Sequence, residues 1–286
     1  MISVVIPVYN EEKRIPSTLS AIYQNTVLPD EVIVADGRST DNTVRLICEH
    51  YPKVIVVDNP ERKAASGRNA GVSIAQGDII AFTDGDCIVD SRWIEAIRNV
   101  FKTYGPDGIG GKVIPAEPEN RIEAYWGNLA WNLIMSFDDT PYQVDTCTIN
   151  DSFVTANCAY RKVLLEQLGG FSQWFGNNAE DTDLCWRAVK IGAKLRYSPE
   201  AVIYARNVTT LSGVIRKSFR NGFSSSKLQK KHGKLVNYDP NIYKMLGKNL
   251  VGMLCRRENA GLNTLELFSH LMGKYYGSIR VGVINV

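Results

Sequence analysis

Over the first 85 residues, short apolar runs alternate with segments of helical apolar spacing, a pattern that few protein folds accommodate. Four strands and three helices are predicted in turn, at residues 2–7, 11–24, 31–35, 41–50, 53–57, 64–75 and 78–83. Strands separated by helices of this length form a parallel sheet with helices on both faces. Ligands of such sheets bind beyond the carboxyl ends of the strands, where Tyr9, Asp36 and Asp84 lie in this sequence.

The second part of the chain has a less regular pattern. Further helices are predicted at residues 92–104, 121–135, 162–168 and 181–191, and further strands at 109–115, 152–160, 194–197 and 201–204. From Leu211 onward, apolar residues recur at helical spacing among basic ones. This spacing indicates an amphipathic basic helix.

Charge is distributed unevenly along the chain. The 286 residues have a formal net charge of +3 and a hydrophobic content of 44%, a composition that excludes a disordered or collagen-like chain. Residues 206–257 carry twelve basic residues and one acid, Asp239, whereas residues 1–205 carry 27 acids and 19 bases. We therefore expect an α/β domain over residues 1–205 and a basic, amphipathic helical extension over residues 206–286.

No uninterrupted apolar run approaches 18 residues, so the sequence predicts no transmembrane helix. The N-terminal segment, Met1 to Pro7, has neither the charged region nor the cleavage pattern of a signal peptide. Both observations favour a cytoplasmic chain.

Two carboxylates follow the predicted strand at 78–83. The turn Thr83-Asp84-Gly85-Asp86 presents two acids one residue apart, a pair that can hold Mg²⁺ or Mn²⁺ beside a phosphate. The alternative is a plain polar turn before a helix.

Two further segments can contact a nucleotide. Asp36 ends the second strand, where a base or ribose is usually bound, although the residues after it also form a capping turn. Arg68 lies among small residues and can hydrogen-bond a base or a phosphate, or can be a surface residue of a closely packed helix.

The acidic run Glu180-Asp181-Thr182-Asp183 begins a predicted helix. Acids at a helix start complement the helix dipole, but this effect does not require the whole run. The preceding Gly169-Gly170-Phe171 is a flexible turn, and Trp174 can stack on a sugar.

Seven segments together resemble family 2 glycosyltransferases of the GT-A fold. They appear in the family's order, over about residues 1–205: Val4 to Glu11, Val34 to Asp41, Gly67 to Gly71, Thr83 to Asp86, Asn157 to Arg161, Gly169-Gly170-Phe171, and Glu180 to Leu184. The resemblance implies a Rossmann-like mixed sheet flanked by helices and transfer of a sugar from a nucleoside-diphosphate sugar.

The resemblance also implies residue roles. Pro7, Tyr9 and Glu11 would line the nucleoside pocket, and Asp36 and Arg68 would contact the base. Asp84 would contact the ribose or the metal-bound phosphates, and Asp86 would coordinate Mn²⁺ or Mg²⁺. Asp181 would be the catalytic base with Glu180 beside it, and Gly170 and Trp174 would belong to the acceptor site.

The sequence departs from the family pattern at two places. Gly37-Arg38 replaces a more usual Asp-Gly or Gly-Gly, and the segment Ala205 to Val208 lacks the histidine that many members supply as a further metal ligand. The third protein ligand of the metal is therefore not assigned by the sequence.

The chemistry implied is a single displacement that inverts the anomeric centre. A divalent cation neutralises the leaving diphosphate, and a carboxylate takes the proton of the acceptor hydroxyl. Asp36 and Arg68 suit the edge of uracil, so a UDP-sugar is the favoured donor, and the expected acceptor is a lipid-linked or cell-surface glycan.

The basic helix indicates a peripheral protein on the inner face of a membrane. Leu211, Val214, Ile215, Phe219 and Phe223 would enter the interface, with the basic residues of 211–231 on anionic headgroups. A helix packed on the catalytic domain is the alternative, whereas the aromatic spacing speaks against nucleic acid.

Two other classes of function remain open from the sequence. A sugar-nucleotide nucleotidyltransferase would carry a Gly-rich segment after the first strand, and this chain has no glycine before Gly37. A non-catalytic membrane-surface protein that keeps the fold would not need the four acids Asp84, Asp86, Glu180 and Asp181.

Overall fold

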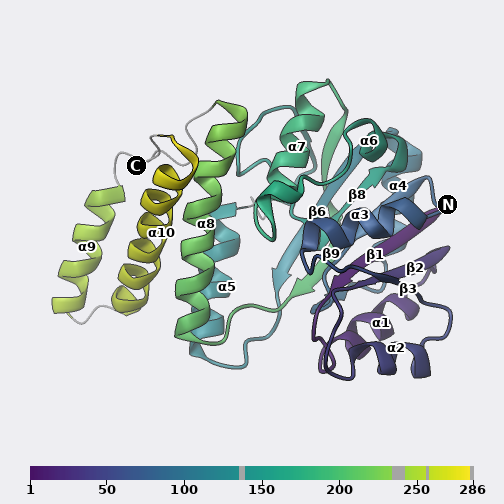
Figure 1. Cartoon of the computed structure of the whole chain (residues 1–286), viewed down its shortest axis with the longest axis horizontal. Coiled ribbons are helices and arrows are strands. Elements are labelled where there is room, and N and C mark those ends of the chain that lie inside the picture. Colours follow the sequence, from purple (N-terminus) through teal and green to yellow (C-terminus); the bar gives the residue numbers. More distant parts are fainter. Residues whose placement is uncertain (135–138, 234–241, 256–257, 284–286) are drawn as a thin grey trace. The chain divides into compact units, whose positions relative to one another are not determined.

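The computed structural model describes residues 1–134, 139–233, 242–255 and 258–283 (Figure 1). The chain divides into two compact units. The first comprises Met1–Ala116 and Leu129–Arg206, and the second comprises Glu117–Asn128 and Asn207–Val286.

The first four strands form the parallel half of the sheet in the first unit. Strands β1 (Ile2–Val8), β2 (Glu31–Asp36), β3 (Ile55–Asp58) and β4 (Ile79–Phe82) pair in the order β3-β2-β1-β4. Helices α1 (Ile15–Tyr23) and α2 (Thr43–His50) lie on one face and α3 (Ala64–Ile74) on the other, as right-handed crossovers require (Figure 1). The alternation predicted from the sequence is confirmed.

The second half of the sheet is mixed. Strand β8 (Cys158–Arg161) runs antiparallel to β4 and to β6 (Gly108–Pro115), while β9 (Leu195–Ala205) runs parallel to β6. The short strands β5 (Cys87–Val89) and β7 (Tyr142–Val144) pair antiparallel with β9. The sheet is therefore the mixed sheet that the family resemblance implied.

Two strand predictions need correction. The predicted strands 194–197 and 201–204 are one strand, β9, whose register with β6 shifts between Gly111 and Lys112. The predicted strand 152–160 begins only at Cys158, because residues 155–157 form a 3₁₀ turn. Asn157, 1% exposed, holds this turn by donating to the carbonyls of Lys112 and Ala201 and accepting from the Trp93 indole.

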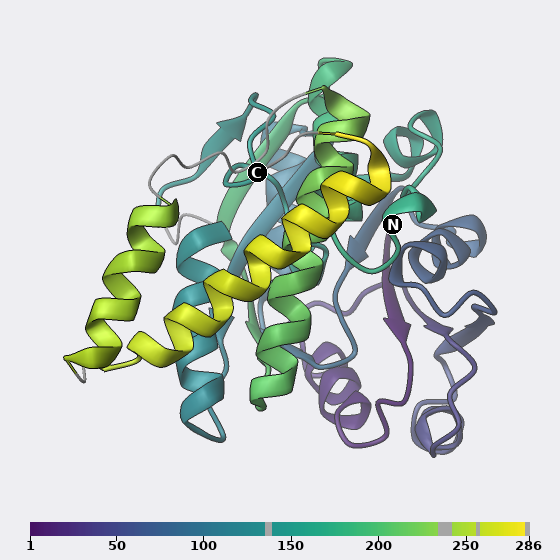
Figure 2. The same ribbon diagram turned by 60° about the vertical axis from the view of Figure 1, so that its left-hand side comes forward.

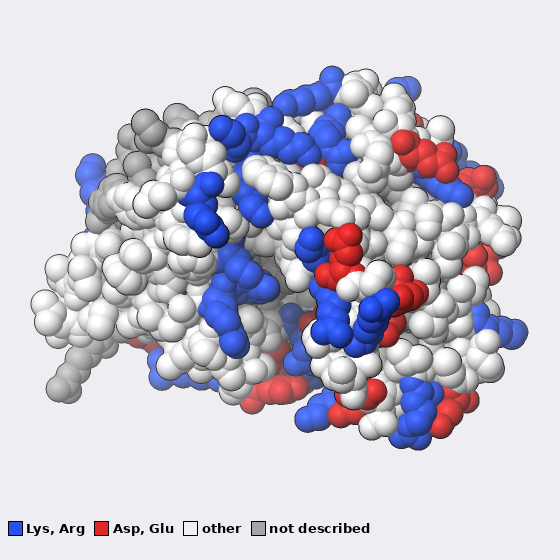
Figure 3. Space-filling model, in the orientation of Figure 1, with Lys and Arg blue, Asp and Glu red and all other residues white. Residues whose placement is uncertain are grey.

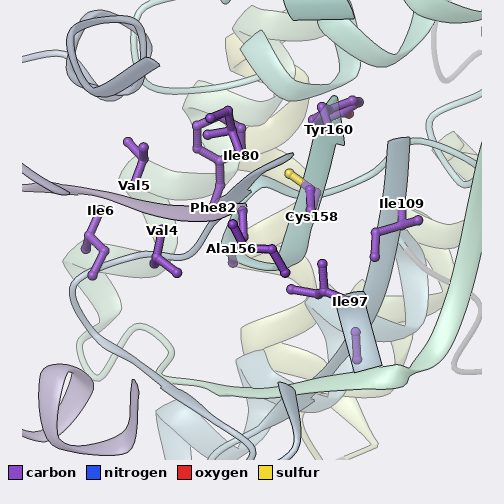
Figure 4. Packing of buried hydrophobic residues seen from close by; sticks show 14 of the residues in the cluster. Val4, Val5, Ile6, Ile80, Phe82, Ile97, Ile109, Ala156, Cys158 and Tyr160 are labelled. Carbon is purple, nitrogen blue, oxygen red and sulfur yellow. The ribbon is translucent and has the colours of Figure 1, made fainter. Parts of the chain in front are cut away.

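Apolar side chains from both halves of the sheet fill the core of the first unit. Val4, Val5 and Ile6 of β1 lie beside Ile80 and Phe82 of β4, and Cys158 and Tyr160 continue the layer from β8 (Figure 4). Helix α3 approaches β1 closely, because a Cβ on Gly71 would overlap the side chain of Val5. Helix α3 therefore packs directly on the middle of β1.

Three more helices complete the first unit. They are α4 (Trp93–Tyr104), α6 (Lys162–Gln167) and α7 (Glu180–Lys190). Helix α4 ends at Gly105, whose φ of 59° is in the left-handed region that glycine adopts without strain. Helix α7 is the one that carries the acidic run.

The second unit is helical. It contains the first turns of α5 (Arg121–Ile134), together with α8 (Leu211–His232), α9 (Ile242–Leu254) and α10 (Ala260–Val281) (Figure 2). The Glu123 carboxylate accepts from the Asn207 amide, and the Tyr125 hydroxyl donates to Asn263. These bonds place residues 117–128 with the C-terminal helices, although the sequence suggested a boundary at 205. The predicted end of the 121–135 helix lies outside the described residues.

Helices α8 and α10 pack backbone against backbone. A Cβ on Gly222 would overlap the His270 carbonyl, and one on Gly273 would overlap the Phe219 carbonyl. Phe219 and Phe223 also contact the Tyr276 ring at centroid distances of 5.8 Å. The apolar face predicted for the 211–231 helix is therefore largely used inside the unit: Val214 is fully buried, and Leu211 and Ile215 remain exposed.

None of the helices within the described residues combines the length and apolar content needed to cross a bilayer.

Candidate active site

The predicted site residues of the first 90 positions gather at the carboxyl ends of β1, β2 and β4. Pro7 and Tyr9 lie at the end of β1, Asp36 ends β2, and Asp84 and Asp86 follow β4. Because β1 pairs with both β2 and β4, these ends share one edge of the sheet. This is the edge at which α/β proteins bind ligands.

Asp84, Asp86 and Cys87 form a cluster of potential metal ligands. One ligand atom from each lies within 4.8 Å of the others. Cys87 is 2% exposed, and burial raises the pKa of its thiol well above the usual range, as do the charges of Asp86 and Asp84. A neutral thiol is a poor partner for a hard cation, so the two carboxylates are the ligands suited to Mg²⁺ or Mn²⁺.

Glu11 lies beside this cluster, and the negative charges of Asp86 and Asp84 affect its pKa. Burial, followed by the charge of Asp86, raises the pKa of Glu11 to about 7, although Arg14 opposes the shift. The Arg14 guanidinium is 3.8 Å from the Asp86 carboxylate. Such a concentration of carboxylates is the environment in which a divalent cation is most strongly held.

Arg68 joins the two acidic segments of the sequence. Its Nη2 donates to Asp84 Oδ1 at 2.8 Å and its Nη1 donates to Glu180 Oε1 at 2.7 Å. The Arg68 side chain is 3% exposed. Burial alone would lower the pKa of this guanidinium, but the charges of Asp84 and Glu180 reverse that effect and raise it. Arg68 therefore stays charged and pairs with two acids, and its contact with the base stays a prediction.

Glu180 and Asp181 begin helix α7 at this site. Burial raises the pKa of Glu180, and the charge of Asp181 adds to the shift while Arg68 opposes it. Burial also raises the pKa of Asp181, against hydrogen bonds from the Thr182 amide and the charge of Arg68. Glu180 is buried, whereas Asp181 is half-buried, so Asp181 is the more accessible of the two carboxylates.

Asn69 fastens the Gly-Gly-Phe turn beside the site. Its side chain donates to the Phe171 carbonyl and accepts from the Phe171 amide, both at 2.8 Å. Gly170 has a φ of 70°, and a Cβ there would come within 2.5 Å of Asn69 Oδ1. Only glycine fits this position.

The same turn is held from the other side by helix α7. Asp183, fully buried, accepts from Arg187 at 2.8 Å, and the Arg187 guanidinium donates to the carbonyls of Leu168 and Gly170. Asp183 is therefore a structural acid, and the acidic run divides into residues of the site and residues that support it.

The remaining predicted site residues make contacts outside the Arg68 bridge. The Asp36 carboxylate is 8% exposed and accepts from the amide and hydroxyl of Ser39. The exposed Tyr9 ring lies under the Arg62 guanidinium. Trp174 is 46% exposed and makes an edge contact with Phe175. Arg38 is exposed and pairs with Asp58.

Sequence reasoning gave no role to three supporting residues. Asn69 and Arg187 hold the turn at Gly170, and Asn177 caps helix α3 by accepting from the Ala64 amide at 2.8 Å. Each bonds to a residue at least 17 positions away, so no local pattern could show the partner. The presence of Asn69 next to Arg68 in the Gly67 to Gly71 segment was the only signal.

Comparison with known proteins decides the family. Residues 3–169 match the family described as Glycosyl transferase family 2. The chain belongs to glycosyl transferase family 2. It is therefore a glycosyltransferase, and the nucleotidyltransferase and non-catalytic alternatives are set aside.

One curated relative of this family 2 glycosyltransferase is Glycosyltransferase AglE of Haloferax volcanii, 28% identical over 229 residues that span 77% of this chain and 71% of the relative. The chain spans between 48% and 71% of the length of the first curated relatives that it matches.

Two solved structures share the fold. The mannosyltransferase PcManGT from Pyrobaculum calidifontis, in complex with GDP-Man and Mn²⁺, has a TM-score of 0.63 at 18% identity, over 96% of this chain and 86% of that one. S. aureus TarS in complex with UDP-GlcNAc has a TM-score of 0.58 at 15% identity, over 99% and 92%. The GT-A fold implied by the sequence is thereby confirmed.

Proposed function

We propose that this family 2 enzyme transfers a sugar from a nucleoside-diphosphate sugar to a hydroxyl acceptor, with inversion and with a divalent metal. The observation that carries the proposal is the Arg68 bridge. One guanidinium binds an acid from the segment after β4 and an acid from the start of α7. Arg68 therefore links Asp84, one of the candidate metal ligands, to Glu180, the neighbour of the candidate base.

Asp84 and Asp86 would hold the metal, either Mn²⁺ or Mg²⁺. Their oxygens suit hard cations, and after burial, the largest cause, the charges of both acids add to the raised pKa of Glu11. When bound, such a cation neutralises charge on the diphosphate leaving group. The mannosyltransferase neighbour was crystallised with Mn²⁺, which supports the same class of metal here.

Asp181 would act as the general base. As the acceptor oxygen bonds to the anomeric carbon, the bond from that carbon to the diphosphate oxygen breaks and its electron pair leaves with the diphosphate. The acceptor proton passes to the Asp181 carboxylate. Burial raises the pKa of Asp181, which brings its basicity closer to neutral pH. Glu180 would position the base through its bond to Arg68.

The nucleoside would lie against Pro7, Tyr9, Glu11 and Asp36. A UDP-sugar is the first donor to test, because Asp36 suits the uracil edge and one structural neighbour binds UDP-GlcNAc. The other neighbour binds GDP-Man, so GDP-sugars belong in the same test. Arg68, although paired with two acids, would contact the base as the sequence resemblance implies.

The acceptor would bind beside Gly170 and Trp174. The turn at Gly170 is rigidly held, and the exposed Trp174 ring offers a stacking surface for a sugar. These features support a glycan acceptor, lipid-linked or on the cell surface, reached from a peripheral position on the inner face of the membrane.

A donor screen tests this proposal. UDP-, GDP- and dTDP-sugars are added with and without Mn²⁺, and donor binding is read as a rise in melting temperature. We expect one nucleotide class to raise it, only with metal, and Asp86→Asn to abolish the rise while Asp78→Asn does not. Donor binding that is equally strong in EDTA would contradict the proposed dependence on a divalent metal. A product with retained anomeric configuration, determined by NMR, would contradict the single displacement.

A further inference from the structure

Helix α9 exposes apolar side chains over most of its surface. Met245, Leu250, Val251 and Met253 are 46–55% exposed, and Leu254 is 86% exposed. Leu250, Val251 and Leu254 follow the i, i+1, i+4 spacing of one helix face. Large apolar patches of this kind mark interaction surfaces.

The neighbouring helix α10 carries a second apolar stripe. Phe268, Met272, Tyr275 and Ile279 recur at intervals of four, three and four residues, and they are 41–82% exposed. Helix α10 packs against α9 and α8 within the second unit (Figure 2). The two exposed stripes therefore belong to adjacent helices, and we call them together the α9–α10 surface.

The charge around the α9–α10 surface is basic. Helix α9 has no acid, and its charged residues Lys244 and Lys248 are both exposed and precede Val251 on one side of the helix. Glu266 is the only acid of α9 and α10, and it is half-buried. Figure 3 shows a broad uncharged surface at the α9 end with Lys and Arg near its border.

The exposed apolar side chains and the basic border together favour a lipid surface over a second copy of the chain as the partner. Lys244 and Lys248 are exposed on α9, and the single acid of the two helices is half-buried, so a second copy of the chain would bring like charge to the same face. An anionic lipid surface matches both the apolar side chains and the basic border. Helices with one apolar face and a basic border of this kind lie in the plane of the interface.

We infer that the α9–α10 surface docks this enzyme on an anionic lipid membrane. This places the contact on α9 and α10, rather than on the 211–231 helix that the sequence suggested. Leu250, Val251 and Leu254 enter the acyl boundary while Lys244 and Lys248 meet the headgroups. The inference does not depend on the sugar-transfer proposal, because membrane binding is measured without donor or acceptor.

Vesicle co-sedimentation of the full chain tests the inference. Vesicles of phosphatidylcholine are compared with vesicles containing about one third phosphatidylglycerol, at low and at high salt. We expect binding to the anionic vesicles that weakens as salt rises. The double variant Lys244→Gln/Lys248→Gln should bind about 30-fold more weakly, since each basic residue contributes about fivefold.

The apolar part of the surface has its own matched control. Leu250→Ser/Val251→Ser/Leu254→Ser should lower binding by at least about tenfold. Leu28→Ser/Ile74→Ser/Val163→Ser, at exposed positions of the first unit, should leave binding unchanged. Circular dichroism of each variant checks its folding.

Three results would overturn the inference. The first is no binding of the parental chain to anionic vesicles at low salt. The second is an equal loss in the α9 variants and the control variants. The third is a dimer by light scattering that the α9 variant dissociates, without any vesicle binding, which would identify a second copy as the partner.

Discussion

The two units of this glycosyltransferase differ in the surface that they expose. Both bury charged side chains, among them Arg68 and Glu180 in the first and Lys274 in the second, each 4% exposed or less. The second unit exposes apolar surface, including Leu254 at 86% and Ile279 at 82%. Folded proteins rarely bury an unpaired charge, and large exposed apolar patches are uncommon.

The two units also differ in how these side chains are partnered. In the first unit buried charges form ion pairs, Arg68 with Asp84 and Glu180, and Asp183 with Arg187. In the second unit the α9–α10 surface is exposed, and it is the surface inferred above to dock on a membrane. Variants at buried and exposed charged groups test whether ion pairing, rather than burial itself, makes the first unit differ from the second.

The largest effect on stability is expected at Arg68. Arg68→Met should destabilise the folded chain by about 3–5 kcal/mol, because it leaves Glu180 buried without its cation. Arg38→Met, which removes an exposed pair with Asp58, should cost less than about 1 kcal/mol. Urea unfolding of both variants measures the difference. Equal losses of unfolding free energy in the two variants would show that the buried Arg68 bridge stabilises the fold no more than the exposed Arg38–Asp58 pair does.

Asn69 should have the next largest effect. Asn69→Ala removes both hydrogen bonds to Phe171 and should cost about 1–3 kcal/mol. Transfer activity should fall as well, because the turn at Gly170 loses its support. Asn99→Ala, at an exposed position of α4, is the control and should be close to neutral. A neutral Asn69→Ala would mean that Arg187 alone holds the turn.

A variant of Glu266 tests how burial of an acid in the second unit affects the pH dependence of stability. Burial raises the pKa of Glu266 from 4.5 to about 7. As pH rises from about 5 to about 7, the unfolded chain ionises this group before the folded chain does, so stability should fall across that window. Glu266→Gln should remove about 1–2 kcal/mol of this fall, since part of the side chain is solvated. Urea unfolding at pH 5 and pH 8 checks the result, and an undiminished fall in the variant would assign it to other groups.

Much of the first unit could be predicted from its sequence. Strand–helix alternation gave the parallel half of the sheet, since apolar periodicity is a local signal. The antiparallel half was harder, because β8 pairs with β4 nearly 80 residues away and only part of its predicted range is extended. Motif spacing singled out Asp84, Asp86, Glu180 and Asp181. The ion pairs of Arg68 with Asp84 and Glu180 could not be predicted, because they join residues far apart in the sequence.

The second unit shows where such reasoning fails. The apolar residues of the 211–231 helix predicted a membrane face, yet Val214 is buried and Phe219 packs on Tyr276. Helical spacing shows that a helix has an apolar face and does not show what covers it. The partner here is α10, joined through Gly222 and Gly273, and no motif in either helix indicates the other.

The central claim is that Asp181, held beside the Arg68 bridge, is the base of the transfer reaction. The most direct measurement is the transfer rate of Asp181→Asn at saturating donor, with donor affinity measured in parallel and Asp78→Asn as control. We predict a fall in rate of about 100- to 10,000-fold with donor affinity nearly unchanged. Near-normal turnover in Asp181→Asn would contradict the account.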